Sequence, residues 1–359
     1  MTTRARLEFA LTRAWTGRGP LACALLPLSW LYSAGHAIHG ALYRSGVLKS
    51  WRVGLPVVVV GNLYAGGTGK TPLVIELVRE LKARGWRPGV ISRGYGRRSA
   101  EVRPVEAGAR ASEVGDEPLL IAQAAAVPVV VGADRVAAAR VLHSLNPKCD
   151  VIVCDDGLQH PRLARDVEIA VLHFNGLGNG WLLPAGPLRD PPERLRTVDA
   201  VVLNGAVPPV RIQGQVFTMN TELDEVYALA DPRHRAPLSA LVEEHRTRGT
   251  RIVAAAGIGA PERFFAMLRA AGLTIDAIPL PDHYDFSANP FLGREFDVAL
   301  ITEKDAVKCR AIAGLNTDGR LCAVSQRTRV EPALIDLIEA KITPSTHHAE
   351  RATDGPSPA

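Results

Sequence analysis

The sequence predicts an α/β protein: a mostly parallel sheet with helices on both faces, and a smaller second α/β domain joined to it by a β-ribbon. From Leu55 onward, short runs rich in Val, Ile and Ala alternate with helical stretches, which is typical of strand–helix–strand units. Near Gln215 an apolar–polar alternation replaces this rhythm, and strand–helix pairs resume after it. We therefore predict domains over residues 51–213 and 231–342, linked by a ribbon over residues 214–230.

Residues 1–50 form the first predicted element, a helical segment that associates with a membrane. Residues 1–52 hold seven basic side chains and one acidic one, and residues 19–43 contain no Asp, Glu, Lys or Arg. Prolines, glycines and histidines within that stretch weaken a straight membrane-spanning helix. We predict that the segment dips into an anionic membrane face. The alternative is a helical hairpin packed on the globular body.

The first domain contains six predicted strands and a well-marked helix. The helix covers residues 70–83, where apolar side chains recur on one face, and Gly85 provides a left-handed end. The strand runs are almost continuously apolar, which is expected when helices cover both faces of a sheet. They lie at residues 56–60, 88–92, 127–131, 151–154, 168–173 and 200–204.

The segment "VVVVGNLYAGGTGKTPL" (57–73) makes the predicted fold P-loop-containing. The usual pattern, G-x-x-x-x-G-K-[ST], requires glycine where Tyr64 stands, but the remaining glycines, Lys70 and Thr71 are in place. Backbone N–H groups at the start of a helix favour a phosphate there. The predicted nucleotide-binding residues are Tyr64, Ala65, Gly66, Gly67, Thr68, Gly69, Lys70 and Thr71. A plain glycine turn with a solvated lysine is the alternative interpretation.

Acidic residues follow at two positions where catalysis or metal binding is plausible. "CDVIVCDDGLQH" is an apolar strand that ends in Asp155 and Asp156, and we predict that Asp155 binds Mg²⁺. "EVGDEPLLIAQA" places Asp116 directly before a helix, where it would serve as a cap residue. His283 in "PLPDHYDF" and Arg189 in "LLPAGPLRDPPERL" are further candidates, for orienting an acid and for binding phosphate.

Composition limits the other classes of function. The 359-residue chain has ordinary apolar and charged fractions, and its five scattered cysteines form no C-x-x-C pair, which argues against disulfides and structural zinc. The net charge of +5 is concentrated at the N-terminal end, so we expect no nucleic-acid binding. The polar, Pro-containing tail at residues 343–359 is predicted to be disordered.

Together these stretches resemble the tetraacyldisaccharide 4'-kinases of lipid A synthesis, which use ATP to phosphorylate a sugar hydroxyl of an acylated glucosamine disaccharide. That family shares the P-loop without its leading glycine. In "GPLRD" the family commonly has glutamate where this chain has Asp190. The matching motifs, in the family's order, are "GNLYAGGTGKTP", "SRGYGR", "GDEPLL", "CDDGLQH", "LLPAGPLRD", "PDHYDF" and "TEKDAVK".

The resemblance implies a role for each predicted site residue. Lys70 and Thr71 would handle ATP and Mg²⁺, with Asp155 at the metal. Asp116 would be the base for the sugar hydroxyl, oriented by His283. Further support for phosphate or substrate would come from Arg189, Gln159 and His160.

The implied reaction is transfer of the γ-phosphate of ATP to the 4'-hydroxyl of a tetraacyl glucosamine disaccharide 1-phosphate, which forms lipid IVA. The family's membrane-associated N-terminus implies a place at the cytoplasmic face of the inner membrane, with the acylated lipid as partner. The alternative is a membrane-associated partition-type ATPase switch that acts on a protein partner. Those ATPases carry a lysine where this chain has Ala65. A GTPase is a third option, but the guanine-selecting [NT]-K-x-D motif is absent.

Overall fold

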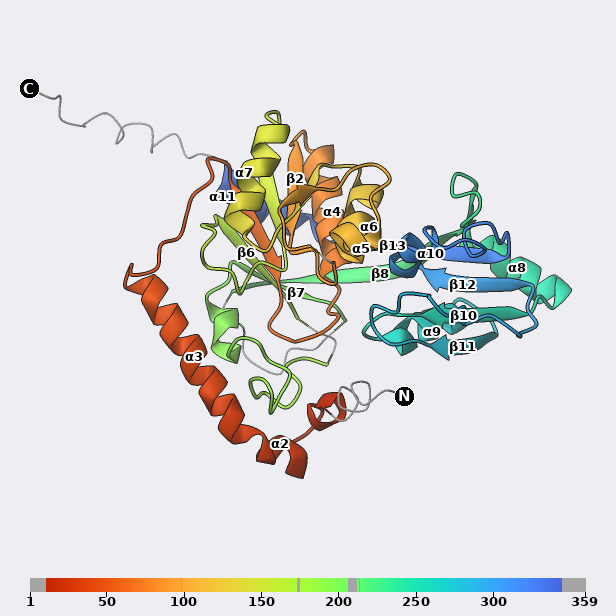
Figure 1. The fold of residues 1–359 in the computed structure, drawn as a ribbon, viewed down its shortest axis with the longest axis horizontal. Helices are drawn as coiled ribbons and strands as arrows, with labels where there is room; N and C mark the ends of the chain where they lie inside the picture. The colour runs from red at the N-terminus through yellow and green to blue at the C-terminus, as the bar shows by residue number, and fades with distance from the viewer. Residues whose placement is uncertain (1–10, 98, 173–174, 206–211, 213, 344–359) are drawn as a thin grey trace, which may run out of the picture.

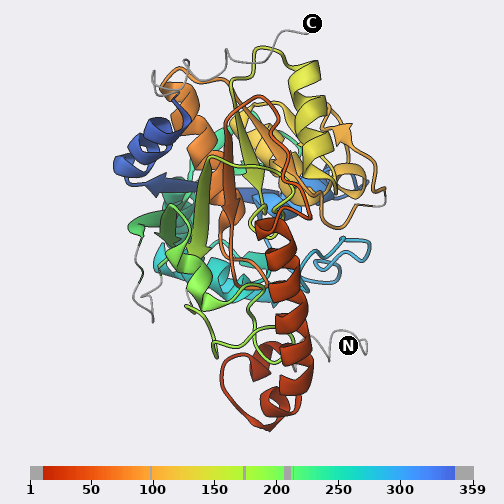
Figure 2. The ribbon, with the colours of Figure 1, turned by 90° about the vertical axis from the view of Figure 1, so that its left-hand side faces the viewer.

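The computed structural model describes residues 11–97, 99–172, 175–205, 212 and 214–343. A larger and a smaller α/β part lie next to each other, and one long strand runs between them (Figure 1). A separate helical arm extends along the larger part, as Figure 2 shows from the side. Part of the predicted N-terminal segment, and the predicted tail from residue 344, lie outside the described residues.

The larger part contains the predicted parallel sheet. Its six principal strands are all parallel, in the spatial order β7-β6-β1-β5-β2-β4, and each overlaps its predicted run. Nearly every side chain in these strands is buried, because helices cover both faces. A short antiparallel edge strand, β3 (Arg103–Pro104), was not predicted. The bounds are β1 Val57–Gly61, β2 Pro88–Ser92, β4 Val129–Val131, β5 Val151–Asp155, β6 Val167–Leu172 and β7 Ala200–Leu203.

Helices pack on both faces of this sheet, as predicted. On one face lie α4 (Lys70–Ala83), which has the predicted bounds, and α6 (Asp116–Ala125). On the other face lies α7 (Arg135–Leu145). Two short elements, α5 (Ala111–Val114) and the 3₁₀ helix η1 (Pro192–Arg196), belong to the connecting loops.

The smaller part is a second α/β unit. Strands β11, β10, β12 and β13 are parallel in that spatial order. Phe264 and Phe265 of α9 pack on one face of this sheet, and Phe286 and Phe291 on the other. The bounds are β9 Arg235–Pro237, α8 Leu238–Arg248, β10 Ile252–Ala256, α9 Pro261–Ala270, β11 Ile275–Pro279, β12 Val298–Thr302, α10 Glu303–Cys309 and β13 Leu321–Val330.

The predicted ribbon consists of β8 (Gln215–Ala228) and a partner from much later in the chain. β8 first pairs in parallel with β7 and then antiparallel with β13, so one sheet continues through both parts. After β13 the chain returns to the larger part as α11 (Pro332–Ile342), whose apolar side chains pack in the same core as α4. The predicted bounds of the smaller domain, residues 231–342, include this helix. Its buried Leu334 and Ile338 instead complete the larger core.

The N-terminal arm consists of α2 (Pro20–Ala24) and α3 (Leu26–Arg44). Polar contacts hold one face of α3 on the loop that follows β6: Ser29 Oγ donates to the Leu182 carbonyl at 2.9 Å, and Tyr32 donates to the Arg189 carbonyl at 2.9 Å. The opposite face exposes large apolar side chains. Among the described helices, none is both long enough and apolar enough to cross a bilayer.

Candidate functional site

The loop between β1 and α4 is shaped by two glycines and one buried asparagine. Gly66 and Gly69 have φ values of 124° and 90°, which L-residues that carry a side chain rarely adopt. Asn62 lies inside the loop and donates from Nδ2 to the Tyr64 carbonyl at 2.7 Å and to Thr68 Oγ1 at 2.8 Å. The loop is therefore closed by a side chain from its own start, and its curvature does not need a glycine at position 64.

Lys70, the first residue of α4, points back over this loop. Its Nζ donates to Asn62 Oδ1 at 3.1 Å and lies 3.5 Å from Asp156 Oδ1. Arg189 reaches the same two residues, with bonds of 3.1 and 2.8 Å to the Asp156 carboxylate. Burial alone would raise the pKa of Asp156, but Lys70 and Arg189 outweigh it and hold that pKa well below its usual range. Two cations thus converge beside the loop between β1 and α4.

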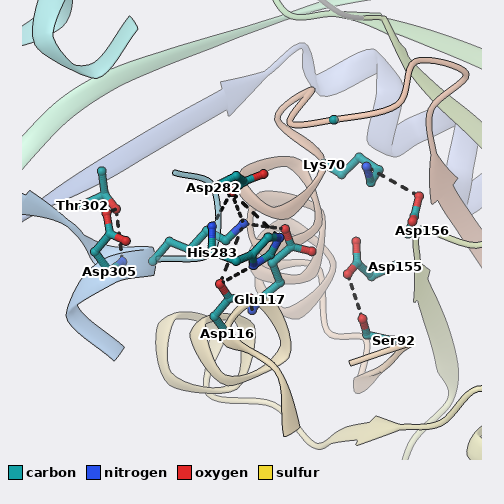
Figure 3. A network of polar contacts seen from close by, with 12 residues as sticks. Lys70, Ser92, Asp116, Glu117, Asp155, Asp156, Asp282, His283, Thr302 and Asp305 are labelled. Atoms are coloured by element: carbon teal, nitrogen blue, oxygen red, sulfur yellow. Dashed lines mark hydrogen bonds and ion pairs between the residues drawn. The ribbon is translucent and has the colours of Figure 1, made fainter. Parts of the chain in front are cut away.

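Asp155, the predicted metal ligand, faces a different direction from Asp156. Ser92 donates to its Oδ2 at 3.0 Å, while its buried Oδ1 has no hydrogen-bond partner among the described residues. Burial, reinforced by the nearby Glu117 and Asp156 carboxylates, raises the pKa of Asp155 to about 7. Figure 3 shows Lys70 with Asp156, and Asp155 with Ser92, as two separate contacts.

Residues that could hold Mg²⁺ are present but do not form a closed protein cage. No cluster of three or more His, Cys, Asp or Glu side chains suited to a metal occurs in the described parts of the chain. The Asp155 Oδ1 atom is an unpaired oxygen of the kind Mg²⁺ prefers, and Thr71 lies half-buried at the start of α4. This donor set fits a Mg²⁺ that is held partly by substrate phosphates.

Asp116 lies at the start of α6, facing the smaller part. The structure makes Gly115, with φ of 93°, the N-cap residue, so the cap interpretation of Asp116 is wrong. Its Oδ2 instead contacts His283 Nδ1 at 2.9 Å (Figure 3). Burial raises the pKa of Asp116, but the hydrogen bond from His283 and the nearby Lys304 more than compensate and leave it below its ordinary value.

His283 comes from the loop after β11, in the smaller part. Its backbone N–H donates to the Gly257 carbonyl at 3.2 Å, and its ring lies 5.2 Å from that of Tyr95, between centroids. The hydrogen bond with Asp116 raises the pKa of His283 above its ordinary value, although burial opposes this. The fold therefore brings two predicted site residues from separate domains into direct contact.

Gln159 and Asp190 extend the loop network toward the N-terminal arm. Gln159 Nε2 donates to the Asn62 carbonyl at 2.9 Å and also to Asp190 Oδ2. Asp190 Oδ1 in turn contacts His36 Nε2 of α3 at 2.6 Å. His160 lies outside this network: its buried Nε2 has no hydrogen-bond partner in the described structure, and burial together with Arg135 lowers its pKa to about 4.

Several residues of the site were not predicted from the sequence. Asn204, which follows β7, donates to the Thr68 carbonyl at 2.9 Å and accepts from Arg263 of α9 at 2.7 Å. A cavity of about 460 Å³ opens at this junction, lined by Asn204, Gly205, Ala260, Glu262 and Arg263. Only the position of Asn62 inside the "GNLYAGGTGKTP" motif offered a signal; Asn204 and Arg263 lie outside every motif.

The comparisons with known proteins agree with this geometry. A family model described as tetraacyldisaccharide-1-P 4'-kinase matches residues 21–343. The chain belongs to this family. Two 4'-kinases among its similar relatives come from Janthinobacterium sp. (strain Marseille), at 50% identity, and Herminiimonas arsenicoxydans, at 49%. Each match covers 94% of this chain and 97% of the relative.

A solved structure of the 4'-kinase family has the same fold. It is the "apo" form of LpxK from Aquifex aeolicus in complex with ATP, which is 30% identical and superposes with a TM-score of 0.75. The match covers 90% of this chain and 100% of that one. Membership in the 4'-kinase family confirms the predicted kinase class and the place in lipid A biosynthesis. The alternative of a partition-type ATPase switch finds no support in these relatives.

Proposed function

We propose that this chain transfers the γ-phosphate of ATP to the 4'-hydroxyl of a tetraacyl glucosamine disaccharide 1-phosphate and so forms lipid IVA. The observation that carries the proposal is the contact between Asp116 and His283, at the junction between the two parts. This contact involves a carboxylate with a lowered pKa, in a protein where Lys70 of the phosphate-binding loop and Arg189 of the loop after β6 both contact Asp156. Those two features supply an acceptor site and a donor site for phosphoryl transfer.

ATP binds with its phosphates on the loop of residues 64–71. The N–H groups at the start of α4 and the Lys70 ammonium face the β- and γ-phosphates, and Arg189 adds a second cation beside them. The cavity bounded by Asn204 and Arg263 lies next to the loop and has room for the nucleoside. Thr71 and Asp155, together with the phosphates, would hold Mg²⁺, which would supply charge compensation on the transferring group.

Asp116 positions the 4'-hydroxyl and receives its proton. Phosphoryl transfer has a loose transition state, so the acceptor needs orientation more than early deprotonation. A carboxylate with a lowered pKa stays ionised at neutral pH and can accept a hydrogen bond from the hydroxyl. His283 fixes the direction of that carboxylate from the other side of the junction.

The lipid substrate reaches the site from the cytoplasmic face of the inner membrane. The outward face of α3 carries Leu28, Leu31 and Ile38, with exposed fractions of 55, 71 and 61%. An exposed apolar stripe on a basic N-terminal arm is suited to shallow insertion among anionic lipids. Since His36 of the same helix contacts Asp190, insertion would hold the site close to the bilayer surface.

A radiolabelled ATP assay with the purified acylated disaccharide in detergent tests the proposal. The wild-type chain should form a labelled lipid, and Asp116→Ala should lower kcat by about 100-fold or more. Lys70→Ala should abolish measurable transfer, whereas Lys148→Ala, at an exposed lysine on a loop of the larger part, should behave like the wild type. Normal transfer by the Lys70 or Asp116 variant would overturn the assignment of the site.

A further inference from the structure

Lys304, on α10 of the smaller part, lies among three carboxylates. Its Nζ donates to Glu117 Oε1 at 3.0 Å and lies 3.7 Å from Asp282 Oδ1 and 3.9 Å from Asp116 Oδ2. The side chain is only 17% exposed. Two of these acids belong to α6 of the larger part and one to the loop of His283, so a single ammonium spans the junction between the parts.

The cluster has an unusual charge balance. Figure 3 shows Asp116, Glu117, Asp282 and His283 gathered in one place. Three carboxylates this close repel one another unless cations lie between them, and the repulsion affects Asp116 most, because its side chain is only 6% exposed, against 29% for Glu117 and 39% for Asp282. Besides Lys304, the nearby groups that can carry positive charge are His283, when it is protonated, and Lys308; Lys308 lies 4.0 Å from Asp116 but 2.8 Å from Asp305, which is its closer partner.

We propose that Lys304 is a positioning residue for phosphoryl transfer, holding Asp116 ionised and directed at His283 by pairing with acids on both sides of the junction. The proposal rests on the proposed role of Asp116. Lys304 acts through this carboxylate and does not reach the phosphate-binding loop. This role would explain the lysine of the "TEKDAVK" motif, which is not among the residues proposed to bind phosphate.

The charge of Lys304 has a predictable effect on the pH dependence of the reaction. Without it, Asp116 would face Glu117 and Asp282 with only His283 and the more distant Lys308 as counter-charges. The pKa of Asp116 would then rise, because neighbouring anions disfavour its ionised form. Activity that needs the carboxylate is lost as pH falls through that pKa. The acidic limb of the pH profile should therefore move to higher pH.

If Lys304 only held the two helices together, a different result would be expected. A variant of Arg310 distinguishes this structural role from the positioning role. Both residues connect α10 to α6: Arg310, which directly follows α10, donates from NH1 to Gln123 Oε1 at 2.6 Å, about two turns along α6 from Asp116. Arg310→Met removes a polar contact between the same two helices and leaves the charges around Asp116 unchanged. If Lys304 only docked α10 on α6, the two variants would alter catalysis alike.

The experiment measures kcat, KM for ATP and the pH profile of kcat/KM for Lys304→Met, Lys304→Arg and Arg310→Met. Lys304→Met should lower kcat by about 10-fold or more and move the acidic limb up by about one pH unit, with KM for ATP changed less than about 3-fold. Lys304→Arg keeps the charge and should recover most of the loss. Arg310→Met should leave the acidic limb in place. Thermal unfolding of each variant identifies any that fails to fold.

The outcomes separate this inference from the function it rests on. If Lys304→Met keeps the wild-type kcat and acidic limb while Asp116→Ala is inactive, the role of Lys304 is overturned and the kinase site stands. If the acidic limb of the pH profile moves equally in Arg310→Met, the role of Lys304 is also overturned, and the residue only docks α10 on α6. If Lys304→Met does not fold, the test rests on Lys304→Arg. A folded Lys304→Arg variant whose acidic limb differs from that of the wild type would also overturn the role of Lys304. Wild-type kcat in Asp116→Ala would overturn the proposed function itself.

Discussion

Gly69 shows how strongly a single residue can constrain the loop between β1 and α4. It immediately precedes α4 with φ of 90°, and a Cβ built there would meet Asn204 Nδ2 and lie 2.7 Å from Met219 Cε. Asn204 cannot move away freely, because it is buried and bonded to Thr68 and Arg263. Glycine is therefore required here for two reasons: the backbone conformation and the lack of space.

Gly69→Ala should destabilise the protein by about 1–3 kcal/mol and weaken ATP binding by about 10-fold or more, since the loop must shift to admit the methyl group. Gly85→Ala is the matched control. Gly85 has φ of 95° after the other end of α4, but nothing lies within 4 Å of its built Cβ. It should show the backbone cost alone, about 1 kcal/mol, with unchanged ATP binding. Urea unfolding and calorimetric titration with ATP measure both effects, and equal behaviour of the two variants would contradict the crowding argument.

The pair of His283 and Asp116 predicts a pH-dependent contribution to stability. The pKa of His283 is raised, so its contribution is present in full below the unfolded value of about 6.5 and is lost as pH rises through the folded value. The pKa of Asp116 is lowered, so its contribution is present above about 3.9 and is lost as pH falls through the folded value. The pair therefore stabilises the fold most between these limits.

His283→Gln should accordingly cost more unfolding free energy at about pH 5.5 than at about pH 9. Urea unfolding of the wild type and the variant at both pH values measures the difference. In an Asp116→Asn background the same substitution should lose most of its pH dependence, because the partner charge is absent. An equal cost at both pH values in the wild-type background would show that the ion pair does not contribute to stability.

At the scale of elements, local patterns in the sequence were sufficient where an element is defined by its own residues. The buried strands of the larger sheet and α4 were predicted because β-branched runs, apolar spacing and a glycine end are local properties. The partner of β8 could not be predicted, because β13 lies about a hundred residues later and its pairing leaves no local pattern. The same limit applies to α11, whose amphipathic sequence does not specify which core it joins.

The candidate site, like the secondary-structure elements, was predictable only where its residues lie in local sequence patterns. Lys70, Asp116 and His283 lie in short motifs whose residue types suit the chemistry, and the fold brings the last two together. The motifs could not indicate that Asp156, rather than Asp155, faces Lys70, because the two directions depend on the backbone after β5. Lys304 was not recognised, since its function depends on carboxylates that are distant in sequence.

The placement of α11 leads to a prediction about core stability. Ile338 is fully buried in the core that α4 and the strands of the larger part share. Ile338→Ala should lower the free energy of unfolding by about 2–5 kcal/mol, the usual cost of such a cavity. The neighbouring Leu337 is only partly buried, so Leu337→Ala should cost clearly less. Urea unfolding provides the measurement; similar small losses for both would indicate that α11 packs only loosely.

At the scale of the whole molecule, the site belongs to neither part alone. Asn204 of the larger part accepts a hydrogen bond from Arg263 of the smaller part, and His283 contacts Asp116 across the same junction. The glycines at 67 and 259 also come close enough that a side chain on Gly259 would lie 3.2 Å from the Gly67 nitrogen. A side chain at position 259 would therefore crowd the junction, whereas one at position 67 would lie at an ordinary contact distance, 3.8 Å from the Gly259 Cα. If Asp116 acts as proposed, catalysis should depend on how the β8–β13 ribbon and the α6–α10 contact hold the two parts together.

In the proposed function the helical arm binds the membrane, and its outward face can be tested separately from its inward contacts. Leu31 and Ile38 are 71 and 61% exposed, whereas Ser29 and His36 on the inward side bond to the body of the protein. The double variant Leu31→Glu/Ile38→Glu should reduce flotation with anionic phospholipid vesicles by about 10-fold or more, because burying each apolar side chain in lipid contributes on the order of 1.5–3 kcal/mol.

Leu292→Glu is the control for this experiment, because it makes the same chemical change at a leucine of the smaller part that is 84% exposed, and it should float like the wild type. In detergent, where the lipid substrate is already dispersed, the double variant should keep its kcat, since the inward contacts of α3 are unchanged. A variant that floats normally would show that the outward face of α3 does not contact the bilayer. One that loses kcat in detergent would show instead that the arm acts on the site through His36 and Asp190.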